Sequence, residues 1–286
     1  MSLIQSKRMV KTEVHKVLER NLEKELEKLD CQFHMLRCLL SQSLSNGVEK
    51  SKSSCQDDAE EKISPYLPQG NRGFHKILQA LCKNGGRHRS KGWHTVLDLN
   101  ECLTKHMYEN IDAEFNLIFS VNAKTGISVQ ELIDKFSIIN CDTAQPAPPM
   151  LNHTEDFIQA QELKQKKKLK EEVVIRKKTI YTSIQTTIKT AMTSCYEEAA
   201  EYKGDGSLKR KQKKLLDDIE SFKCNMFDNA KQEVLRQSDQ LMGDIKEGLK
   251  SEIKTSIQHS FAQASNITLL DVSSEIKALE KLSTQL

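Results

Sequence analysis

The sequence predicts an all-α protein, an elongated antiparallel helical bundle, and three observations support this fold class. Hydrophobic residues make up 37% of the chain and charged residues 29%, a balance typical of bundles that expose much surface per residue. Five prolines and eleven glycines in 286 positions are too few for the many turns of an all-β chain. Apolar residues also recur at spacings of three and four over long stretches, which indicates amphipathic helices.

Residues 1–45 are predicted to form one N-terminal helix with a heptad seam. Its apolar residues step by four and three positions, at Leu22, Leu26, Leu29, Phe33, Leu36 and Leu40. Such a seam packs against another helix, either in the same chain or in a second copy. About three heptads are short for an independent coiled coil, which favours packing within the chain.

A polar linker is expected over residues 46–72. The sequence Ser45-Asn46-Gly47 is expected to end the first helix, because Gly and Asn are common at helix C-termini. Serine, lysine and acidic residues follow, and then Pro65, Pro68 and Gly70. This composition is typical of a linker between packed elements.

Residues 73–140 are predicted to form a helical module around two amphipathic helices. The first carries Phe74, Ile77, Leu78 and Leu81 on one face, and Asn84-Gly85-Gly86 ends it. The second has apolar residues at intervals of four and three between Leu99 and Ile118, and a third begins with the capping-box pair Ser128 and Glu131. The residues expected to maintain this scaffold are Phe74, Leu78, Leu81, Trp93, Leu99, Leu103, Ile111, Phe115 and Phe119.

A proline-rich break is predicted over residues 141–152, because Pro146, Pro148 and Pro149 lie too close together for a helix interior. Residues 153–286 are predicted to form a long antiparallel helical hairpin. Its two long helices span 153–203 and 207–264, and Gly204-Asp205-Gly206-Ser207 joins them. Helices joined by so short a turn must lie antiparallel. A short last helix is predicted at residues 271–284.

The string GFHKILQALCKNGG, followed by LDLNECLTKHMYENIDAEFNLIF, resembles the helical region behind the GTPase domain in the nuclear GTPase SLIP-GC group of dynamin-like large GTPases. The resemblance extends over residues 60–285 and is most specific over 73–119. It implies a stalk-type helical region that couples GTP binding and hydrolysis to self-assembly in an intact family member. It also implies a protein partner, either a second copy or a dynamin-like GTPase.

GTP hydrolysis by this chain alone is not expected. A phosphate-binding loop needs Gly-x-x-x-x-Gly-Lys-Ser/Thr, and no stretch of the sequence has this pattern. Asn122-Ala123-Lys124 is better interpreted as an ordinary turn than as a guanine-contacting loop. The chain is therefore expected not to be an enzyme, and GTP and magnesium are expected only for a GTP-binding domain elsewhere.

Metal binding is a second possibility, since His75, Cys82, Cys102 and His106 are ligand types for zinc at helical spacings. No Cys-x-x-Cys pair anchors such a site, so no metal is expected. The alternative is that both histidines lie at helix surfaces while both cysteines pack as small apolar groups.

A basic run, Lys209, Arg210, Lys211, Lys213 and Lys214, follows the turn between the two long helices. It is interpreted either as a solvated charged face, as a nuclear-import signal, or as a contact for nucleic acid or anionic membrane. The last interpretation gives the alternative function, an adaptor acting through residues 209–214. The net charge of +3 argues against a dedicated nucleic-acid binder.

Eight cysteines are scattered without short paired spacings, and no signal peptide or apolar run of eighteen residues is found. These features predict free thiols in a nuclear or cytoplasmic protein that is neither secreted nor transmembrane.

Overall fold

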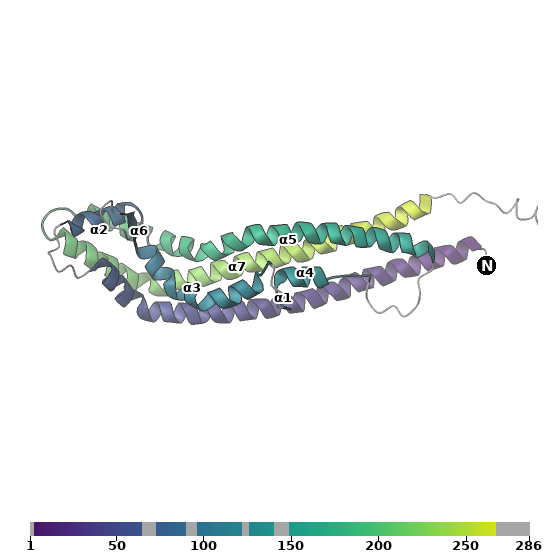
Figure 1. Ribbon diagram of the computed structural model, residues 1–286, viewed down its shortest axis with the longest axis horizontal. Coiled ribbons are helices and arrows are strands. Elements are labelled where there is room, and N and C mark those ends of the chain that lie inside the picture. Colours follow the sequence, from purple (N-terminus) through teal and green to yellow (C-terminus); the bar gives the residue numbers. More distant parts are fainter. Residues whose placement is uncertain (1–2, 65–72, 90–95, 122–125, 140–148, 267–286) are drawn as a thin grey trace, which may run out of the picture. The chain divides into compact units, whose positions relative to one another are not determined.

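A computed structural model describes residues 3–64, 73–89, 96–121, 126–139 and 149–266. This part of the chain is almost entirely helical, which confirms the predicted all-α class (Figure 1). None of the described helices combines the length and the apolarity needed to cross a membrane. The elements are α1 (Leu3–Ile63), α2 (Phe74–Lys83), β1 (Arg87–Arg89), β2 (Val96–Asp98), α3 (Leu99–Ile118), α4 (Val129–Lys135), α5 (Pro149–Ala191), α6 (Thr193–Glu201) and α7 (Ser207–Asn266).

The chain divides into two compact units. The smaller unit comprises residues 1–26, 137–165 and 248–286, and the larger unit comprises residues 27–136 and 166–247. Helices α1, α5 and α7 each contribute residues to both units. Trp93 and the predicted helix at residues 271–284 lie outside the described residues.

The smaller unit is stabilised by side chains that bind the irregular segment after α4. The Asn21 amide donates to the Ile138 carbonyl at 3.0 Å, and the Ile138 amide donates to the Glu162 carboxylate at 2.9 Å. Glu162 is only 2% exposed. Side chains of α1 and α5 therefore satisfy both backbone polar groups of Ile138, which has no backbone hydrogen bond of a helix or strand.

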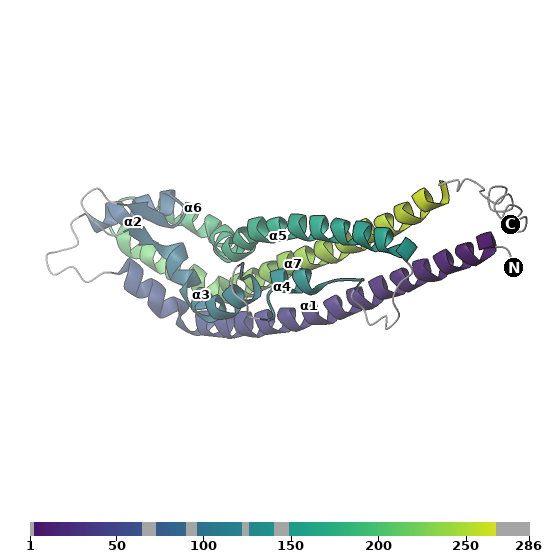
Figure 2. The same cartoon turned by 45° about the vertical axis from the view of Figure 1, so that its right-hand side comes forward.

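In the larger unit, α1, α3, α5 and α7 run side by side (Figures 1 and 2). Residue numbers rise along α1 as they fall along α7, so the two helices are antiparallel. The ion pairs that establish this register are Asp30–Lys246 at 2.7 Å, Arg37–Asp239 at 2.9 Å and Lys52–Asp228 at 3.1 Å. The pairs Arg176–Asp244 and Glu198–Lys214 give the same antiparallel relation for the predicted hairpin of α5, α6 and α7.

The heptad seam of α1 packs within the chain. All six predicted seam residues, from Leu22 to Leu40, are buried, with Leu40 completely so. The interior of the larger unit continues this seam with apolar residues of α3, α5 and α7, including Met107, Ile184 and Leu241.

The prediction that Ser45-Asn46-Gly47 ends the first helix was wrong, because α1 continues to Ile63. A Cβ atom at Gly47 would lie 3.0 Å from the Met107 Cα and 3.3 Å from the Met107 carbonyl oxygen. Gly47 therefore allows α1 to approach the backbone of α3 closely. The linker predicted over 46–72 is helical as far as Ile63, and its residues 65–72 lie outside the described part.

The predicted ends of the other elements agree with the structure in three places. Gly85 and Gly86 end α2 with φ values of 63° and 87°, in the left-handed region that favours glycine. Ser128 and Glu131 form the predicted capping box of α4. Gly204 and Gly206, also at positive φ, make the predicted turn before α7.

Three local details differ from the predictions. The connection after α2 contains an antiparallel ribbon of β1 and β2, whose three-residue strands are too short to show a sequence period. The helix predicted over 153–203 is interrupted at Met192 between α5 and α6. The proline-rich break predicted over 141–152 is already helical from Pro149, a residue that suits the first turn of a helix.

Replacement of Gly47 by leucine should destabilise the larger unit by about 1–3 kcal/mol, because the side chain has no space between α1 and α3. Urea denaturation followed by circular dichroism measures the change. The matched control is Gly243→Leu, at a helical glycine where an added Cβ atom would have no neighbour within 4 Å. That control should be neutral or stabilising by up to about 1 kcal/mol. Equal stability of the two variants would refute the close-approach role of Gly47.

Candidate functional site

The four residues considered as metal ligands have different surroundings in the structure. His75 is exposed on α2, Cys82 is buried on the same helix, and Cys102 and His106 lie on α3. Within the described residues, no group of three or more His, Cys, Asp or Glu side chains is arranged to hold a metal ion. Cys102 and His106 instead share a partner on α1, Asp58.

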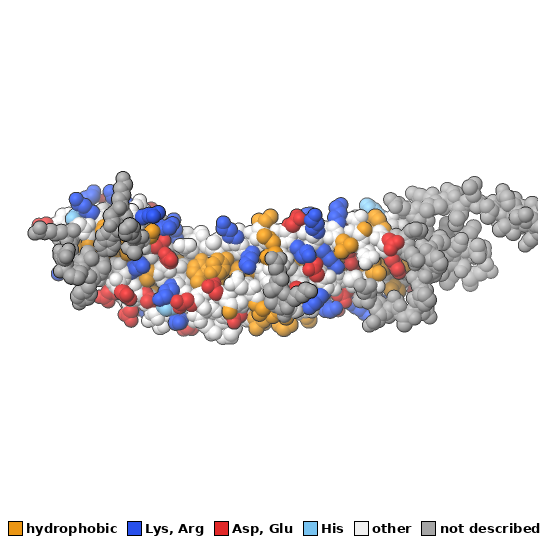
Figure 3. All heavy atoms as spheres, viewed as in Figure 1, with side chains coloured by type: hydrophobic (Ala, Val, Ile, Leu, Met, Phe, Trp, Pro, Cys, Tyr) orange, Lys and Arg blue, Asp and Glu red, His pale blue; other side chains and the backbone are white. Residues whose placement is uncertain are grey.

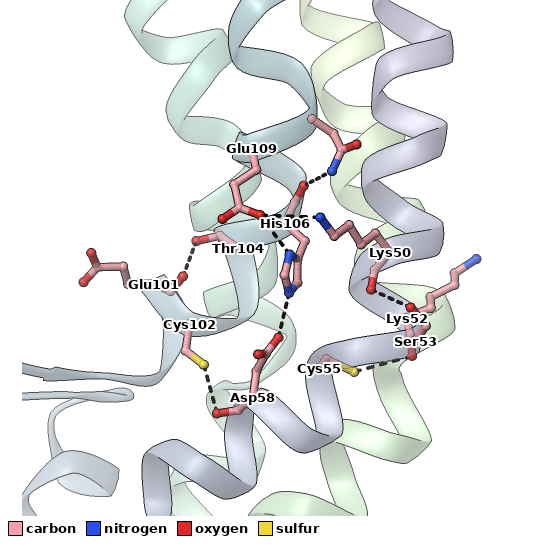
Figure 4. A network of polar contacts seen from close by, with 11 residues as sticks. Lys50, Lys52, Ser53, Cys55, Asp58, Glu101, Cys102, Thr104, His106 and Glu109 are labelled. Carbon is pink, nitrogen blue, oxygen red and sulfur yellow. Dashed lines mark hydrogen bonds and ion pairs between the residues drawn. The ribbon is translucent and has the colours of Figure 1, made fainter.

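His106 lies between two carboxylates (Figure 4). Its Nε2 is 2.8 Å from the Asp58 Oδ2 on α1, and its Nδ1 is 3.0 Å from the Glu109 Oε2 on α3. A neutral imidazole carries one N–H group, so only the protonated ring donates to both carboxylates. The ring therefore connects α3 to α1 through its contact with Asp58.

Cys102 adds a second contact to Asp58. Its thiol donates to the Asp58 backbone carbonyl at 3.3 Å, and burial raises the pKa of this thiol to about 11. A thiol with so high a pKa is protonated at neutral pH and is a poor nucleophile or metal ligand. Cys102 therefore acts as a packing and hydrogen-bonding residue in this network.

A second buried network joins α6 to the start of α3. The Tyr196 hydroxyl, on a side chain only 1% exposed, donates to the Asn100 Oδ1 at 2.9 Å. The Asn100 amide donates to the Gly85 carbonyl at 2.8 Å. A Cβ atom at Gly86 would lie 2.5 Å from the Tyr196 ring and hydroxyl, so this position accepts only glycine. The network fixes the turn after α2 against α3 and α6.

Two buried thiols lie in the elements that this network joins. Burial raises the pKa of Cys82 to about 11, and burial together with a hydrogen bond to Asp218 raises the pKa of Cys195. Both are fully inside the protein, with at most 2% of the residue exposed. We assign Cys82 and Cys195 to the interior packing of α2 and α6.

Three members of the predicted basic run are engaged in the turn between α6 and α7. Lys211 is 2% exposed, and its ammonium donates to the Tyr202 carbonyl. Lys214 bridges Glu198 at 2.6 Å and Asp218 at 3.1 Å. Arg210 donates to two carbonyls of the turn and lies over the Tyr202 ring.

The remaining members, Lys209 and Lys213, are exposed. Only these two of the five side chains therefore present their charge to solvent without a contact in the described part of the chain. The interpretation of residues 209–214 as a binding patch stays a prediction.

The predicted scaffold residues lie in the interior wherever the structure describes them. Each is at most 4% exposed, and they belong to α2, to α3 and to the residue that follows α3. The buried residues are Phe74, Leu78, Leu81, Leu99, Leu103, Ile111, Phe115 and Phe119.

No protein-family model matches the chain, and no solved structure matches it. Two curated proteins match it. The nuclear GTPase SLIP-GC of Homo sapiens is 28% identical over 278 residues, which cover 94% of this chain and 34% of that protein. This chain is similar to nuclear GTPase SLIP-GC. The protein of the same name from Mus musculus is 26% identical over 273 residues, 93% of this chain and 34% of that protein.

This similarity confirms the predicted resemblance to the nuclear GTPase SLIP-GC group, which was most specific over residues 73–119. It extends over almost the whole chain, so the two units both fall within it. The chain spans about a third of the length of these curated relatives.

Replacement of His106 by phenylalanine should destabilise the larger unit by about 1–3 kcal/mol, since it leaves the half-buried Asp58 carboxylate without its donor. Urea denaturation at pH 6 measures the loss. A double-mutant cycle with Asp58→Asn should show coupling between the two residues. The matched control, His75→Phe on the exposed face of α2, should change stability by less than about 0.5 kcal/mol. Additive effects of the His106 and Asp58 replacements would exclude the link.

Lys211→Met should raise stability at neutral pH, because it removes a charged amine from a buried position. Desolvation lowers the pKa of Lys211 from its ordinary value of 10.5, so the unfolded chain binds more protons than the folded chain between the two pKa values. The Lys211 contribution therefore becomes more favourable as pH rises toward 10.5. Denaturation midpoints of the parent and Lys211→Met, compared from pH 7 to pH 10, should converge with rising pH. A gap that widens instead would contradict the burial of a charged amine.

Proposed function

We propose that this chain is a helical assembly region of a protein related to nuclear GTPase SLIP-GC, in which it couples GTP binding and hydrolysis to self-association. The similarity over 94% of the chain is the observation that carries the proposal. The relative is named a GTPase, whereas no phosphate-binding loop pattern occurs in these 286 residues. The nucleotide, with its magnesium, would therefore bind to a region outside this sequence.

The packing of the larger unit supports a mechanical role. Ion pairs join α1 to α7 at three levels, and the contact between His106 and Asp58 joins α3 to α1. A displacement applied to one helix is passed to its neighbours, because tightly packed interiors resist compression. Such a unit carries a change of conformation from one region of a protein to another without chemistry of its own.

Exposed apolar side chains supply a surface for self-association. On α5, Val174 and Ile175 are 47% and 71% exposed, and on α1 Met35 is 53% exposed. Figure 3 shows hydrophobic side chains at the surface between charged ones. Burial of such side chains between two copies contributes roughly 25 cal/mol per Å2 of apolar area. A function in the nucleus belongs to the same proposal, since the relative is named a nuclear GTPase.

Sedimentation velocity and GTP turnover together test the proposed function. The purified chain should show a concentration-dependent increase in sedimentation coefficient and no GTP turnover. The purified chain should also be added in excess to full-length human SLIP-GC. Assemblies that contain both proteins would then replace assemblies of SLIP-GC alone, so the dependence of GTP turnover on SLIP-GC concentration should change.

Ile175→Gln should weaken self-association, and Lys178→Gln, at an exposed residue of the same helix, is the matched control that should not. A chain that stays monomeric at all concentrations and leaves the turnover of SLIP-GC unchanged would contradict the proposal. GTP turnover by the chain itself would contradict the assignment of nucleotide chemistry to another region.

A further inference from the structure

We propose that the surface formed by Lys83, Arg87, Arg89 and Lys189, here called the ribbon patch, binds nucleic acid through its phosphates. The patch lies on three elements, the C-terminus of α2, the strand β1 and the helix α5. It is distinct from the basic run at residues 209–214, and the inference does not depend on the proposed assembly function.

The sequence around the ribbon patch contains no acidic residue for a long stretch. Residues 62–97 include seven lysines and arginines, and neither Asp nor Glu occurs among them. The whole chain has 40 acidic residues in 286 positions, about one in seven, so a stretch of this length would ordinarily contain about five. Positive charge is therefore concentrated here although the protein as a whole is nearly neutral.

The fold places the four residues of the ribbon patch around the turn at Gly85. Arg87 and Arg89 are two residues apart on β1, so their side chains lie on the same face of the strand, and both are exposed. Lys83 lies at the end of α2, and the tight turn at Gly85 connects it to Arg87 and Arg89 on β1. Lys189 reaches this turn from α5, since its Cε would lie 3.4 Å from a Cβ atom at Gly85. Figure 3 shows lysine and arginine side chains over the region where Figure 1 places α2 and α6.

Among the ion pairs of the described residues, one involves the ribbon patch. Asp98, opposite Arg87 in the ribbon, pairs with it at 3.2 Å, but the same carboxylate also accepts the Glu101 amide to cap α3. Arg89 lies opposite Val96. Lys83, Arg89 and Lys189 form no ion pair in the described part of the chain. In the run at 209–214, by contrast, Lys214 is bridged to two carboxylates and Lys211 is buried.

The side-chain types favour phosphates of nucleic acid over a membrane surface. Arginine presents a planar fork of donors that matches a phosphate in a bidentate contact. Proteins that bind membrane surfaces add apolar side chains that enter the lipid. The large hydrophobic residues found exposed in the described chain are Met35, Leu39, Val121, Leu163, Val174 and Ile175. None of them belongs to α2, β1 or β2, and the three on α5 precede Lys189 by 14 residues or more, about four helical turns.

Fluorescence anisotropy with a labelled 20-nucleotide single-stranded DNA tests the inference on the full chain. Release of counterions makes the logarithm of the binding constant fall with the logarithm of salt concentration, with a slope of about −0.7 per phosphate contact. Four contacts predict about 50-fold weaker binding at 200 mM KCl than at 50 mM. The double variant Lys83→Gln/Arg89→Gln should reduce the magnitude of the slope by about 1.4 and weaken binding at 50 mM by on the order of 10- to 100-fold.

Lys209→Gln/Lys213→Gln is the matched control, because it removes the same charge from exposed residues of α7. This control should bind DNA as the parent does, and both double variants should keep the parent's thermal unfolding midpoint. Equal loss in the two double variants would overturn the assignment to the ribbon patch, as would an unchanged affinity of Lys83→Gln/Arg89→Gln. Binding to phosphatidylserine-containing vesicles without binding to DNA would overturn the assignment to nucleic acid.

Discussion

The close contact between α1 and α3 is the constraint on which the larger unit depends. Gly47 leaves room for the backbone at Met107, and Met107 is completely buried as a result. The next residue back, His106, places its ring against Asp58 of α1. A close steric fit and a polar contact therefore involve neighbouring residues of α3, so a separation of the two helices would lose both at once.

The helical class and most element ends could be predicted from the sequence, but the role of a glycine could not. Asn46-Gly47 and Asn84-Gly85 have the same composition, yet the second pair ends a helix and the first does not. A usable signal did exist, because the seam continues beyond Gly47 at Val48, Cys55 and Ile63. It was obscured by Ser51 and Ala59, small residues at seam positions that do not stand out as apolar.

The candidate sites were harder to predict, because their partners are distant in sequence. Cys102 and His106 are among the candidate ligands in the sequence, but their common partner Asp58 lies in a stretch predicted to be a linker. Composition alone did not distinguish Lys211, which is buried, from Lys209, which is exposed. The difference arises from the turn between α6 and α7, where a backbone carbonyl accepts one ammonium group and leaves the other in solvent.

The distribution of cysteines has a practical consequence for spectroscopy. Burial raises the pKa of the thiol at Cys55, Cys82 and Cys102 to about 11, whereas Cys31 and Cys38 on α1 and Cys224 on α7 are exposed. Maleimide probes react with thiolates, so they would attach to the outer thiols of the native chain and spare the inner ones. Dyes on Cys224 and on one of the α1 cysteines would report the distance between α7 and α1, with no engineered cysteine.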